Sequence, residues 1–568
     1  MAGNLRDASR NFWRNRVNGV PVDRCRTTND SGFTLDQDRV AREAKAGFWP
    51  DRTIAEYFDT TLASRPNANY LTAYRTDQAQ AESLSYAELS SRVSAIAAGL
   101  KQIGVQHGDV VSFQLPNWWQ FVSTHLACVR IGAVSNPLMP IYRERELEFM
   151  VGRSGAKVLI VPKTFRGFDH EQLAHRMQQR IATLEQVFVV GGDGKNSFES
   201  ALLHATQGER GDDQAGLHPN DIMKIMYTSG TTGEPKGVMH TSNTILCSMK
   251  SVIDRVGLTE DDVIFMPSPF AHSIGFCYGI LMSLYLGVEL VTMDVWDRAT
   301  AADIMERHGV TFMFGATPFL SDLANLPGIE RRNLDRFRIF LTAGAPVPPT
   351  LVDKAESVLG ASVVPGFGMT ELGLVTAVLP TDPARGRETD GYAFPHTELR
   401  LVDAGQRNPQ HGMEGELQCR GSSTFVGYHG RPDLYNVDED GWFATGDLAR
   451  VNEDGYIRIV GRSKDIIIRG GENIPVVEVE HLMHEMSQIN EVAIVGISDK
   501  RLGERSCAFV SLHDGKDLTL NQVVNFLDSR KLARQYLPEK LIVVDSLPKT
   551  PAGKVQKFEL RELADRAS

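Results

Sequence analysis

Apolar and polar positions along the first two thirds of the chain follow two alternating patterns. Residues 84–104 show the helical one, in which four apolar side chains fall on a single face: Leu89, Val93, Ile96 and Leu100. Ser85 and Glu88 stand three residues apart at the start of this segment, as in a capping box, and Gly104 is expected to stop the helix. The spacing therefore predicts an amphipathic helix here.

The second pattern consists of short runs in which nearly every residue is apolar and many are β-branched. Such runs are typical of strands that are buried on both faces, as in a parallel sheet covered by helices. The clearest runs are residues 109–117, 156–162, 184–191, 310–318 and 337–346. Strands and helices in alternation predict the α/β class.

The pattern changes near residue 375, where shorter strands and tight turns begin. The segments that show this are residues 397–403, 415–421 and 450–461, the last with an Asp454-Gly455 hairpin turn. Short helices and strands follow after Arg462. We therefore expect a variable N-terminal arm, a large N-terminal domain and a smaller C-terminal domain, with boundaries at residues 1–50, 51–461 and 462–568.

Composition narrows the class of protein. A chain of 568 residues exceeds what one hydrophobic core usually supports, and its net charge of −11 argues against a nucleic-acid binder. The longest run free of both charged residues and histidine, residues 273–288, is shorter than the ~20 residues that cross a bilayer, so a buried helix is expected there and no transmembrane segment. Six cysteines without CxxC pairs favour reduced thiols and a cytoplasmic location.

The N-terminus lacks the apolar stretch of a signal peptide. Its first sixteen residues are rich in arginine, which leaves a transit peptide or a plain surface arm as alternatives.

Residues 227–237, with the sequence YTSGTTGEPKG, form a hydroxyl-rich and glycine-rich loop between a predicted strand and a predicted helix at residues 240–253. Bare backbone N–H groups in such a loop bind phosphate oxygens well. It is not a Walker A loop, because Pro235 and Gly237 flank the lysine where other residues are required. We expect a polyphosphate site, with a flexible surface loop as the alternative. The candidate donors are Thr228, Ser229, Gly230, Thr231, Thr232 and Lys236.

A second cluster, PGFGMTELG at residues 365–373, contains a carboxylate at Glu371. Its GxG lacks the third glycine of a dinucleotide-binding fingerprint. A lone carboxylate beside a phosphate loop is repulsive unless a cation lies between them, so Glu371 is a candidate Mg²⁺ ligand. The alternative is a solvated glutamate at the start of a helix.

Two further clusters carry candidate functional residues. Within GWFATGDLA (residues 441–449), Asp447 is expected at the end of a β-turn, where a carboxylate can accept hydrogen bonds from ribose hydroxyls. Within KTPAGKVQK (residues 549–557), Lys554 follows a Pro-Ala-Gly turn that exposes it enough to reach another domain. An ordinary surface lysine is the alternative for Lys554.

In this order and spacing, the four clusters resemble the adenylate-forming superfamily of acyl-CoA synthetases, luciferases and adenylation domains of peptide synthetases. The resemblance covers roughly residues 50–568. MPSPFAHSIGF (residues 266–276) and GRSKDIIIRGGENIPVVEVE (residues 461–480) are most similar to cyclohexanecarboxylate and short-to-medium-chain fatty acyl-CoA ligases. The resemblance implies a large N-terminal domain of two helix-covered sheets with a small β-barrel-like unit, followed by a small mobile α+β domain.

The activity that the resemblance implies is ATP-dependent ligation of a carboxylic acid to coenzyme A through an acyl-adenylate, with Mg²⁺ and with release of AMP and pyrophosphate. The expected acid is apolar, either medium-chain fatty or alicyclic. An aromatic-acid CoA ligase, a ligase that loads a carrier protein, a luciferase and a non-catalytic nucleotide-binding regulator are the alternatives. A homodimer is one option for the oligomeric state, and no nucleic-acid partner is expected.

The resemblance also assigns roles to residues of the N-terminal domain. Thr228 and Thr370 contact the phosphates, and Asp447 with Arg462 holds the ribose. Adenine is expected between the backbone of residues 342–346 and Phe367, where the family more often has tyrosine. The residues concerned are Gly344, Ala345, Pro346, Gly366, Phe367, Gly368 and Met369.

For the later steps, the resemblance makes Lys554 the bridge between the attacking carboxylate and the α-phosphate, and it makes Lys464 the hinge of the C-terminal domain. The expected thiol tunnel is lined by Arg469, Gly470, Gly471 and Glu472. His272 would orient the acid or gate its pocket, with a buried core histidine as the alternative. An apolar acyl pocket is expected from Phe270, Ile274, Gly275, Phe276, Phe314, Thr317, Met369 and Leu372.

Overall fold

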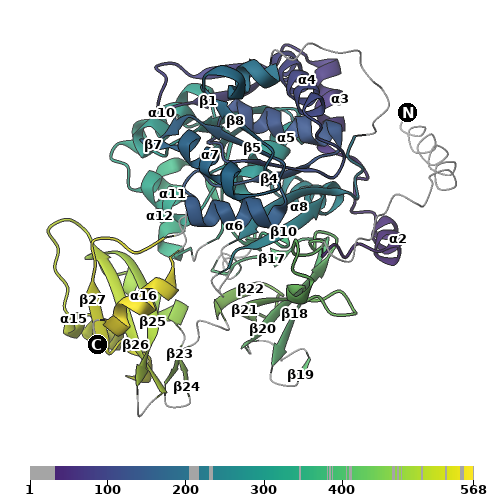
Figure 1. Ribbon diagram of the computed structural model, residues 1–568. Helices are drawn as coiled ribbons and strands as arrows, with labels where there is room; N and C mark the ends of the chain where they lie inside the picture. The colour runs from purple at the N-terminus through teal and green to yellow at the C-terminus, as the bar shows by residue number, and fades with distance from the viewer. Residues whose placement is uncertain are drawn as a thin grey trace, which may run out of the picture.

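The computed structural model shows a large body, a small sheet at its edge and a separate C-terminal unit (Figure 1). The α/β class and the large-plus-small architecture predicted from the sequence are confirmed. The residues that the structure describes are 32–203, 216–228, 234–344, 347–379, 381–382, 386, 388–403, 406–407, 412, 414–462, 467–469, 472–474, 476–499, 503–530, 532, 534–549 and 555–566.

The larger sheet of the body has nine strands, parallel in its centre and antiparallel at both edges. Its parallel strands are buried runs, as their apolar sequences predict. In spatial order the strands are β17 (Tyr392–Ala393), β16 (Gly373–Ala377), β15 (Ser362–Met369), β14 (Ile339–Thr342), β13 (Phe312–Gly315), β11 (Val263–Met266), β12 (Glu289–Met293), β1 (Asn69–Tyr74) and β2 (Glu82–Ser85).

The second sheet has six strands, parallel except for the antiparallel pairing of its edge strand β10 with β9. In spatial order they are β10 (Lys236–Thr241), β9 (Ile222–Thr228), β4 (Val134–Pro137), β3 (Val110–Phe113), β5 (Val158–Pro162) and β8 (Gln186–Val190). Both sheets contribute side chains to one shared hydrophobic core.

Helices cover both faces of each sheet. The layer between the sheets consists of α3 (Ile54–Ser64), α4 (Tyr86–Gln102), α5 (Trp119–Ile131), α8 (Ser242–Val256), the π-helix η4 (Ile274–Leu281) and α9 (Met282–Leu286). The outer face of the larger sheet carries α10 (Arg298–His308), α11 (Thr317–Ala324) and α12 (Pro349–Leu359). The outer face of the smaller sheet carries α6 (Glu144–Ser154) and α7 (His170–Arg180).

Helix α4 forms as its sequence predicts. Ser85 accepts a hydrogen bond from the Glu88 backbone and the Glu88 carboxylate binds back, which completes the capping box. Gly104, just past the end of the helix, has a φ of +88°, a conformation that favours glycine. The buried helix expected at residues 273–288 is present, but its first half is the π-helix η4.

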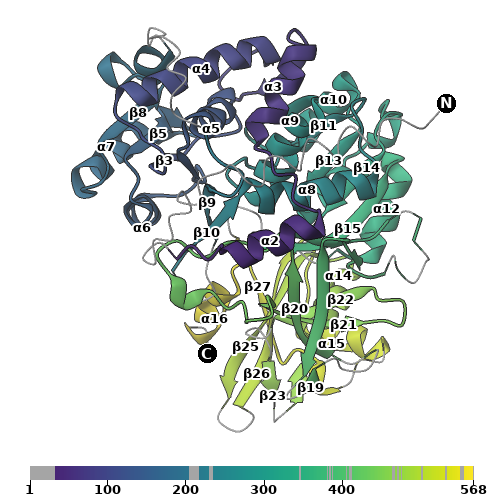
Figure 2. The same ribbon diagram turned by 90° about the vertical axis from the view of Figure 1, so that its right-hand side faces the viewer.

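The small β-rich unit is a five-stranded antiparallel sheet, and helix α2 (Gln37–Ala46) lies beside it (Figure 2). The Arg39 guanidinium of α2 donates to the carbonyls of Thr424 and Phe425, and Glu43 accepts from Ser422. The strands are β19 (Gln406–Arg407), β18 (Thr397–Asp403), β20 (Glu414–Gly421), β21 (Phe443–Val451) and β22 (Ile457–Arg462).

The C-terminal unit is a second small sheet with helices packed on it. Its strands are β23 (Ile467–Arg469), β24 (Glu472–Ile474), β25 (Ile489–Asp499), β26 (Gly503–Leu512) and β27 (Lys540–Val543), and its helices are α14 (Val476–His484), α15 (Leu520–Ser529) and α16 (Lys557–Arg566). Across the part of the chain that the structure describes, no helix combines the length and the apolar character that a membrane span requires.

Candidate active site

The predicted phosphate loop closes a β-hairpin. Lys236, the first residue of β10, pairs with Thr228, the last residue of β9, so both side chains stand at the mouth of the loop. Ser229, Gly230, Thr231 and Thr232 lie outside the described residues. The expectation that the loop leads directly into a helix is wrong, because residues 236–241 form a strand and α8 begins only at Ser242. The helix N-terminus is therefore not next to the loop.

Residues 425–429 form backbone hydrogen bonds with β10, the second strand of this hairpin. His429 N donates to Gly237 O at 2.8 Å, and Met239 N donates to Gly427 O at 3.0 Å. Gly427 has a φ of +129°, and a Cβ there would lie 1.9 Å from Gly32 O, so only glycine permits this close approach. The pairing brings the Tyr428 ring to 5.1 Å from Lys236 Nζ.

Glu371 lies in the turn between β15 and β16 and is buried, with an exposed fraction of 7%. Its Oε1 accepts a hydrogen bond from the Tyr428 hydroxyl at 2.8 Å. Burial raises the pKa of Glu371, and the Tyr428 hydrogen bond and the positive charges of Lys236 and Arg462 oppose that rise. The alternative of a solvated glutamate at a helix start is wrong. The carboxylate is instead buried and bound to the Tyr428 hydroxyl.

The glycines of the second cluster allow β15 and β16 to approach each other. A Cβ at Gly366 would lie 2.6 Å from Thr376 O, and one at Gly368 would lie 2.4 Å from Gly373 O. Phe367 and Met369, on the other side of β15, pack partly buried against the core of the small sheet. Gly344 follows β14 with a φ of +92°, whereas Ala345 and Pro346 lie outside the described residues.

Asp447 and Arg462, the two residues expected to hold the ribose, form an ion pair. They are opposite each other in β21 and β22, and Arg462 Nε lies 2.9 Å from Asp447 Oδ1. The expected position of Asp447 at the end of a β-turn is wrong, because it lies within β21. The register of β20 and β21 shifts there, and Gly446 has a φ of +74°. This is a β-bulge, which changes the direction in which a side chain points from its strand.

His272 lies in the turn that leads into η4. Its Nδ1 accepts a hydrogen bond from Ile274 N at 3.2 Å, so in the neutral ring Nε2 carries the proton. Burial, with a smaller contribution from Lys224, lowers the pKa of His272 to about 4. Ser273 Oγ donates to Thr370 Oγ1 at 3.3 Å, which connects η4 to the second cluster.

Glycines also shape η4. A Cβ at Gly275 would lie 2.2 Å from Pro269 O, and one at Gly279 would lie 2.6 Å from Met266 Cγ. π-Helices occur often at functional sites.

The residues expected to form the acyl pocket lie in two different hydrophobic clusters. Phe270, Ile274, Phe276 and Phe314 belong to the core between the sheets, whereas Leu372, only 2% exposed, is part of the core of the small sheet.

Residues expected to form the thiol tunnel are only partly described. Arg469 in β23 makes a bidentate ion pair with Glu539, with both N–O distances at 3.0 Å. Glu472 lies opposite Arg469 in β24. Gly470, Gly471, the expected hinge residue Lys464 and Lys554, which was expected to bridge acid and phosphate, lie outside the described residues.

Two residues near this site were not singled out from the sequence. Tyr428 holds Glu371, but its segment gave no signal that joined it to the other clusters. Lys224 is fully buried in β9, and a charged residue within an otherwise apolar strand is a signal that the sequence does contain.

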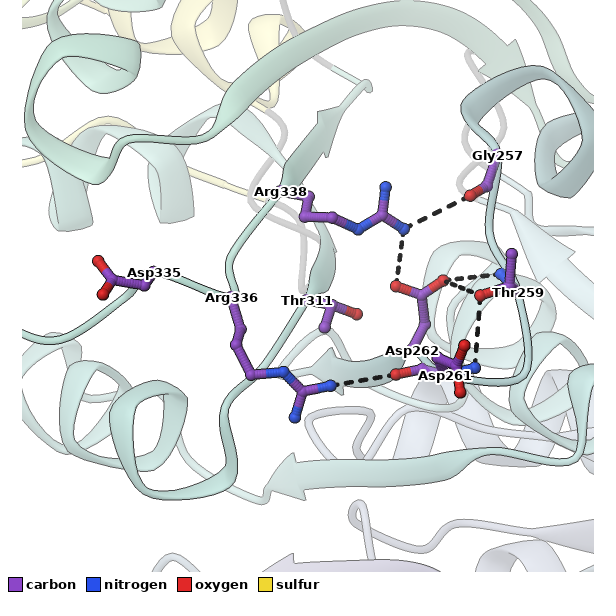
Figure 3. Close-up of a pocket in the computed structure, with 8 residues that line it drawn as sticks. All are labelled: Gly257, Thr259, Asp261, Asp262, Thr311, Asp335, Arg336 and Arg338. Carbon is purple, nitrogen blue, oxygen red and sulfur yellow. Dashed lines mark hydrogen bonds and ion pairs between the residues drawn. The ribbon is translucent and has the colours of Figure 1, made fainter.

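A cavity of about 410 Å³ lies elsewhere in the larger sheet (Figure 3). Arg338 Nη2 donates to Asp262 Oδ1 at 2.7 Å beside it, and Arg336 Nη2 donates to Asp261 O at 3.2 Å. These residues precede β11 and β14, so the cavity is at the amino ends of the parallel strands. Ligands of open α/β sheets bind at the carboxyl ends, where the clusters above converge.

Comparisons with known proteins agree with this geometry. The family model described as "AMP-binding enzyme" matches residues 58–429, and the one described as "AMP-binding enzyme C-terminal domain" matches residues 478–554. The chain is 35% identical to the Medium-chain fatty-acid–CoA ligase of Escherichia coli K12, over 93% of this chain and 94% of that protein. It is 30% identical to the human Medium-chain acyl-CoA ligase ACSF2, mitochondrial, over 98% and 95%.

Solved structures of similar proteins overlay with nearly the whole chain. ATP-bound MatB from Rhodopseudomonas palustris overlays with a TM-score of 0.80 at 27% identity, over 90% of this chain and 98% of that one. A Mycobacterium tuberculosis fatty acyl CoA synthetase overlays with a TM-score of 0.68 at 26% identity, over 91% and 99%. The chain therefore belongs to the AMP-binding enzyme family and is an acyl-CoA synthetase of the adenylate-forming superfamily.

Proposed function

We propose that this ligase activates a medium-chain fatty or alicyclic carboxylic acid. The observation that carries the proposal is the apolar layer around η4, to which Phe270, Ile274 and Phe276 belong. The names of the two relatives that cover nearly the whole chain support the medium-chain class. Apolar side chains dominate η4, and no carboxylate in residues 266–281 could pair with the ammonium of an amino acid.

In the first half-reaction, a carboxylate oxygen of the acid attacks the α-phosphorus of ATP, and the bond to the β-phosphate oxygen breaks with loss of pyrophosphate. In the second, the coenzyme A thiol attacks the acyl carbon, and AMP leaves with the electron pair of the anhydride bond. The first step joins two anions, so stabilisation of negative charge dominates its catalysis.

The residues at the mouth of the hairpin suit that task. Lys236 and Thr228, with the loop donors Ser229, Gly230, Thr231 and Thr232, would hold the β- and γ-phosphates, and Thr370 would contact the α-phosphate. Lys554 would supply positive charge where the acid attacks. Asp447 would accept from the ribose hydroxyls, while its ion pair with Arg462 fixes its orientation. Phe367 would stack on adenine opposite Gly344, Ala345 and Pro346.

The donors present also fit a magnesium ion. Mg²⁺ binds through one or two carboxylates together with phosphate oxygens. Glu371 offers such a carboxylate, and Tyr428 binds only its Oε1 among the described contacts of the side chain. When bound, the ion would neutralise charge on the phosphates. Glu371 would be its protein ligand.

His272 would orient the acid as a neutral ring. We expect His272→Asn, which keeps an acceptor for Ile274 N, to retain most activity, whereas His272→Ala should raise KM for the acid by about tenfold, as for one lost hydrogen bond. Because the pKa of His272 is lowered to about 4, the unfolded chain binds more protons than the folded one as the pH falls below about 6.5.

The stability that the neutral ring contributes is therefore lost between pH 6.5 and 4. Melting temperatures measured across this range should fall less steeply for His272→Asn than for the wild type. Equal slopes would contradict a neutral, partly buried ring.

The C-terminal unit would turn between the half-reactions about Lys464. In this structure Arg458 in β22 lies 3.0 Å from His481 Nδ1 in α14, which joins the two units across the expected hinge. We expect Lys464→Pro to lower thioester formation from a supplied acyl-adenylate by about tenfold or more, because proline restricts the φ change that a hinge needs. Pyrophosphate exchange should stay near wild type. A parallel fall of both rates would show that Lys464 is not the hinge.

The proposal is tested by a CoA-thioester assay over C4–C12 fatty acids, cyclohexanecarboxylate and benzoate, run beside ATP–pyrophosphate exchange. The expected maximum is among the C6–C10 and alicyclic acids. A maximum at benzoate would favour an aromatic-acid ligase. Exchange without thioester would favour transfer to a carrier protein, and no exchange with any acid would favour a regulator.

We also propose a cytoplasmic location and a homodimer. The cytoplasmic location is supported by the five described cysteines, which are all buried free thiols, as in a reducing compartment. Light scattering of the purified chain tests whether it is a homodimer.

A further inference from the structure

Lys224 is a lysine without exposed surface in the middle of β9. Its Nζ lies 3.6 Å from Cys277 Sγ, 3.9 Å from Met226 Sδ and 4.8 Å from the centroid of the Phe276 ring. Sulfur atoms are weak acceptors, and no carboxylate among the described residues forms an ion pair with this amine. Burial lowers the pKa of Lys224, and its amine keeps N–H donors for which no strong acceptor lies among the described residues.

The amine faces the same side of the sheet as the reaction centre. Alternate residues of a strand point to one face, so Lys224, Met226 and Thr228 share a face of β9. At about 3.3 Å per residue, Lys224 lies about 13 Å along the strand from Thr228. Ser273 Oγ lies 3.2 Å from Met226 Sδ and 3.3 Å from Thr370 Oγ1. A continuous row of contacts thus leads from Thr370 down to Lys224.

A second buried polar atom belongs to a ring that also packs against Phe276. His125 Nε2 is buried and has no hydrogen-bond partner among the described residues, while Nδ1 pairs with Ser135 Oγ at 2.9 Å. The His125 ring centroid lies 4.7 Å from that of Phe276, and Ser135 is the strand neighbour of Lys224. Burial and the charge of Lys224 lower the pKa of His125 to about 3, so this ring is neutral at pH 7. The Lys224 amine and the His125 ring therefore both lie against Phe276, within the apolar layer between the two sheets.

We propose that Lys224 is a specificity-determining residue at the far end of the acyl pocket, where its amine donates to an oxygen on the distal end of the acid. The inference rests on the proposed function, because it places the acyl chain along η4. A terminal methyl leaves the amine buried without a strong acceptor, whereas a distal hydroxyl or second carboxylate supplies one. Sites built to hydrogen-bond a substrate oxygen discriminate strongly against analogues that lack it.

The test is kcat/KM for CoA-thioester formation with octanoate, 8-hydroxyoctanoate and octanedioate. We expect the wild type to favour one of the oxygenated acids over octanoate by about tenfold or more. The hydroxy acid and the diacid separate a neutral oxygen from a second carboxylate as the preferred group. This comparison needs no variant, so it holds even if substitutions at Lys224 fail to fold.

Lys224→Met keeps the length of the side chain and removes the donor. We expect it to lower the ratio of oxygenated acid to octanoate by about tenfold or more. Lys157→Met is the matched control, because Lys157 is a partly exposed lysine bound to Asp109, and it should leave the ratio unchanged.

A wild-type preference for octanoate, or a ratio that Lys224→Met does not change, would overturn the assignment. Failure of the wild type to form any thioester would instead overturn the proposed function.

Discussion

We expect Lys554→Ala to lower acyl-adenylate formation by about 10²–10³, the scale on which loss of one preorganised charge donor acts. Negative charge builds between the acid and the α-phosphate in the transition state, and this amine would be strongest there. Thioester formation from a supplied acyl-adenylate involves no such meeting of anions. That half-reaction should therefore continue at close to the wild-type rate.

The measurement is ATP–pyrophosphate exchange beside single-turnover thioester formation from synthetic acyl-adenylate. Lys557→Ala is a suitable control, since Lys557 lies three residues further on but binds Glu480 at 2.7 Å within the C-terminal unit. It should change the two rates together, if at all. Equal loss of both half-reactions in Lys554→Ala would remove this lysine from the adenylation step.

The second large effect is expected from Glu371→Gln. This substitution should lower the rate of adenylation by about 10²-fold. It should also raise the Mg²⁺ concentration that gives half of the maximal rate. Glutamine has the shape of glutamate and keeps an acceptor for the Tyr428 hydroxyl. The substitution therefore removes the charge and leaves the turn between β15 and β16 intact. Loss of activity with an unchanged melting temperature would separate charge from structure.

Titration of adenylation with Mg²⁺ is the decisive readout for Glu371. Glu330→Gln serves as its control, because Glu330 is an exposed carboxylate beside Arg331 and should leave the titration unaltered. A Glu371→Gln protein that works normally at ordinary Mg²⁺ would show that the buried carboxylate is structural.

Much of the fold follows from local sequence. Helix α4 and its capping box depend on residues three to four apart. The parallel strands are recognisable because both of their faces are buried, and Asp454-Gly455 produces the predicted hairpin between β21 and β22. The loop expected at residues 227–237 joins β9, which ends at Thr228, to β10, which begins at Lys236, and its binding of phosphate stays a prediction. The helix expected at residues 240–253 is present as α8, but strand β10 before it was not predicted, since it forms by pairing with β9 and with residues 425–429.

The chemical identity of the site was determined by the sequence itself: which hydroxyls, glycines, carboxylates and lysines are present, and in what order, because these are properties of short segments. Only the tertiary structure decided how those groups are paired. Tyr428 reaches Glu371, Arg462 orients Asp447 and Lys224 lies against Cys277 across long separations in the chain. The physical reason is that burial sets the cost of each charge, and burial depends on contacts between distant segments that no local pattern contains.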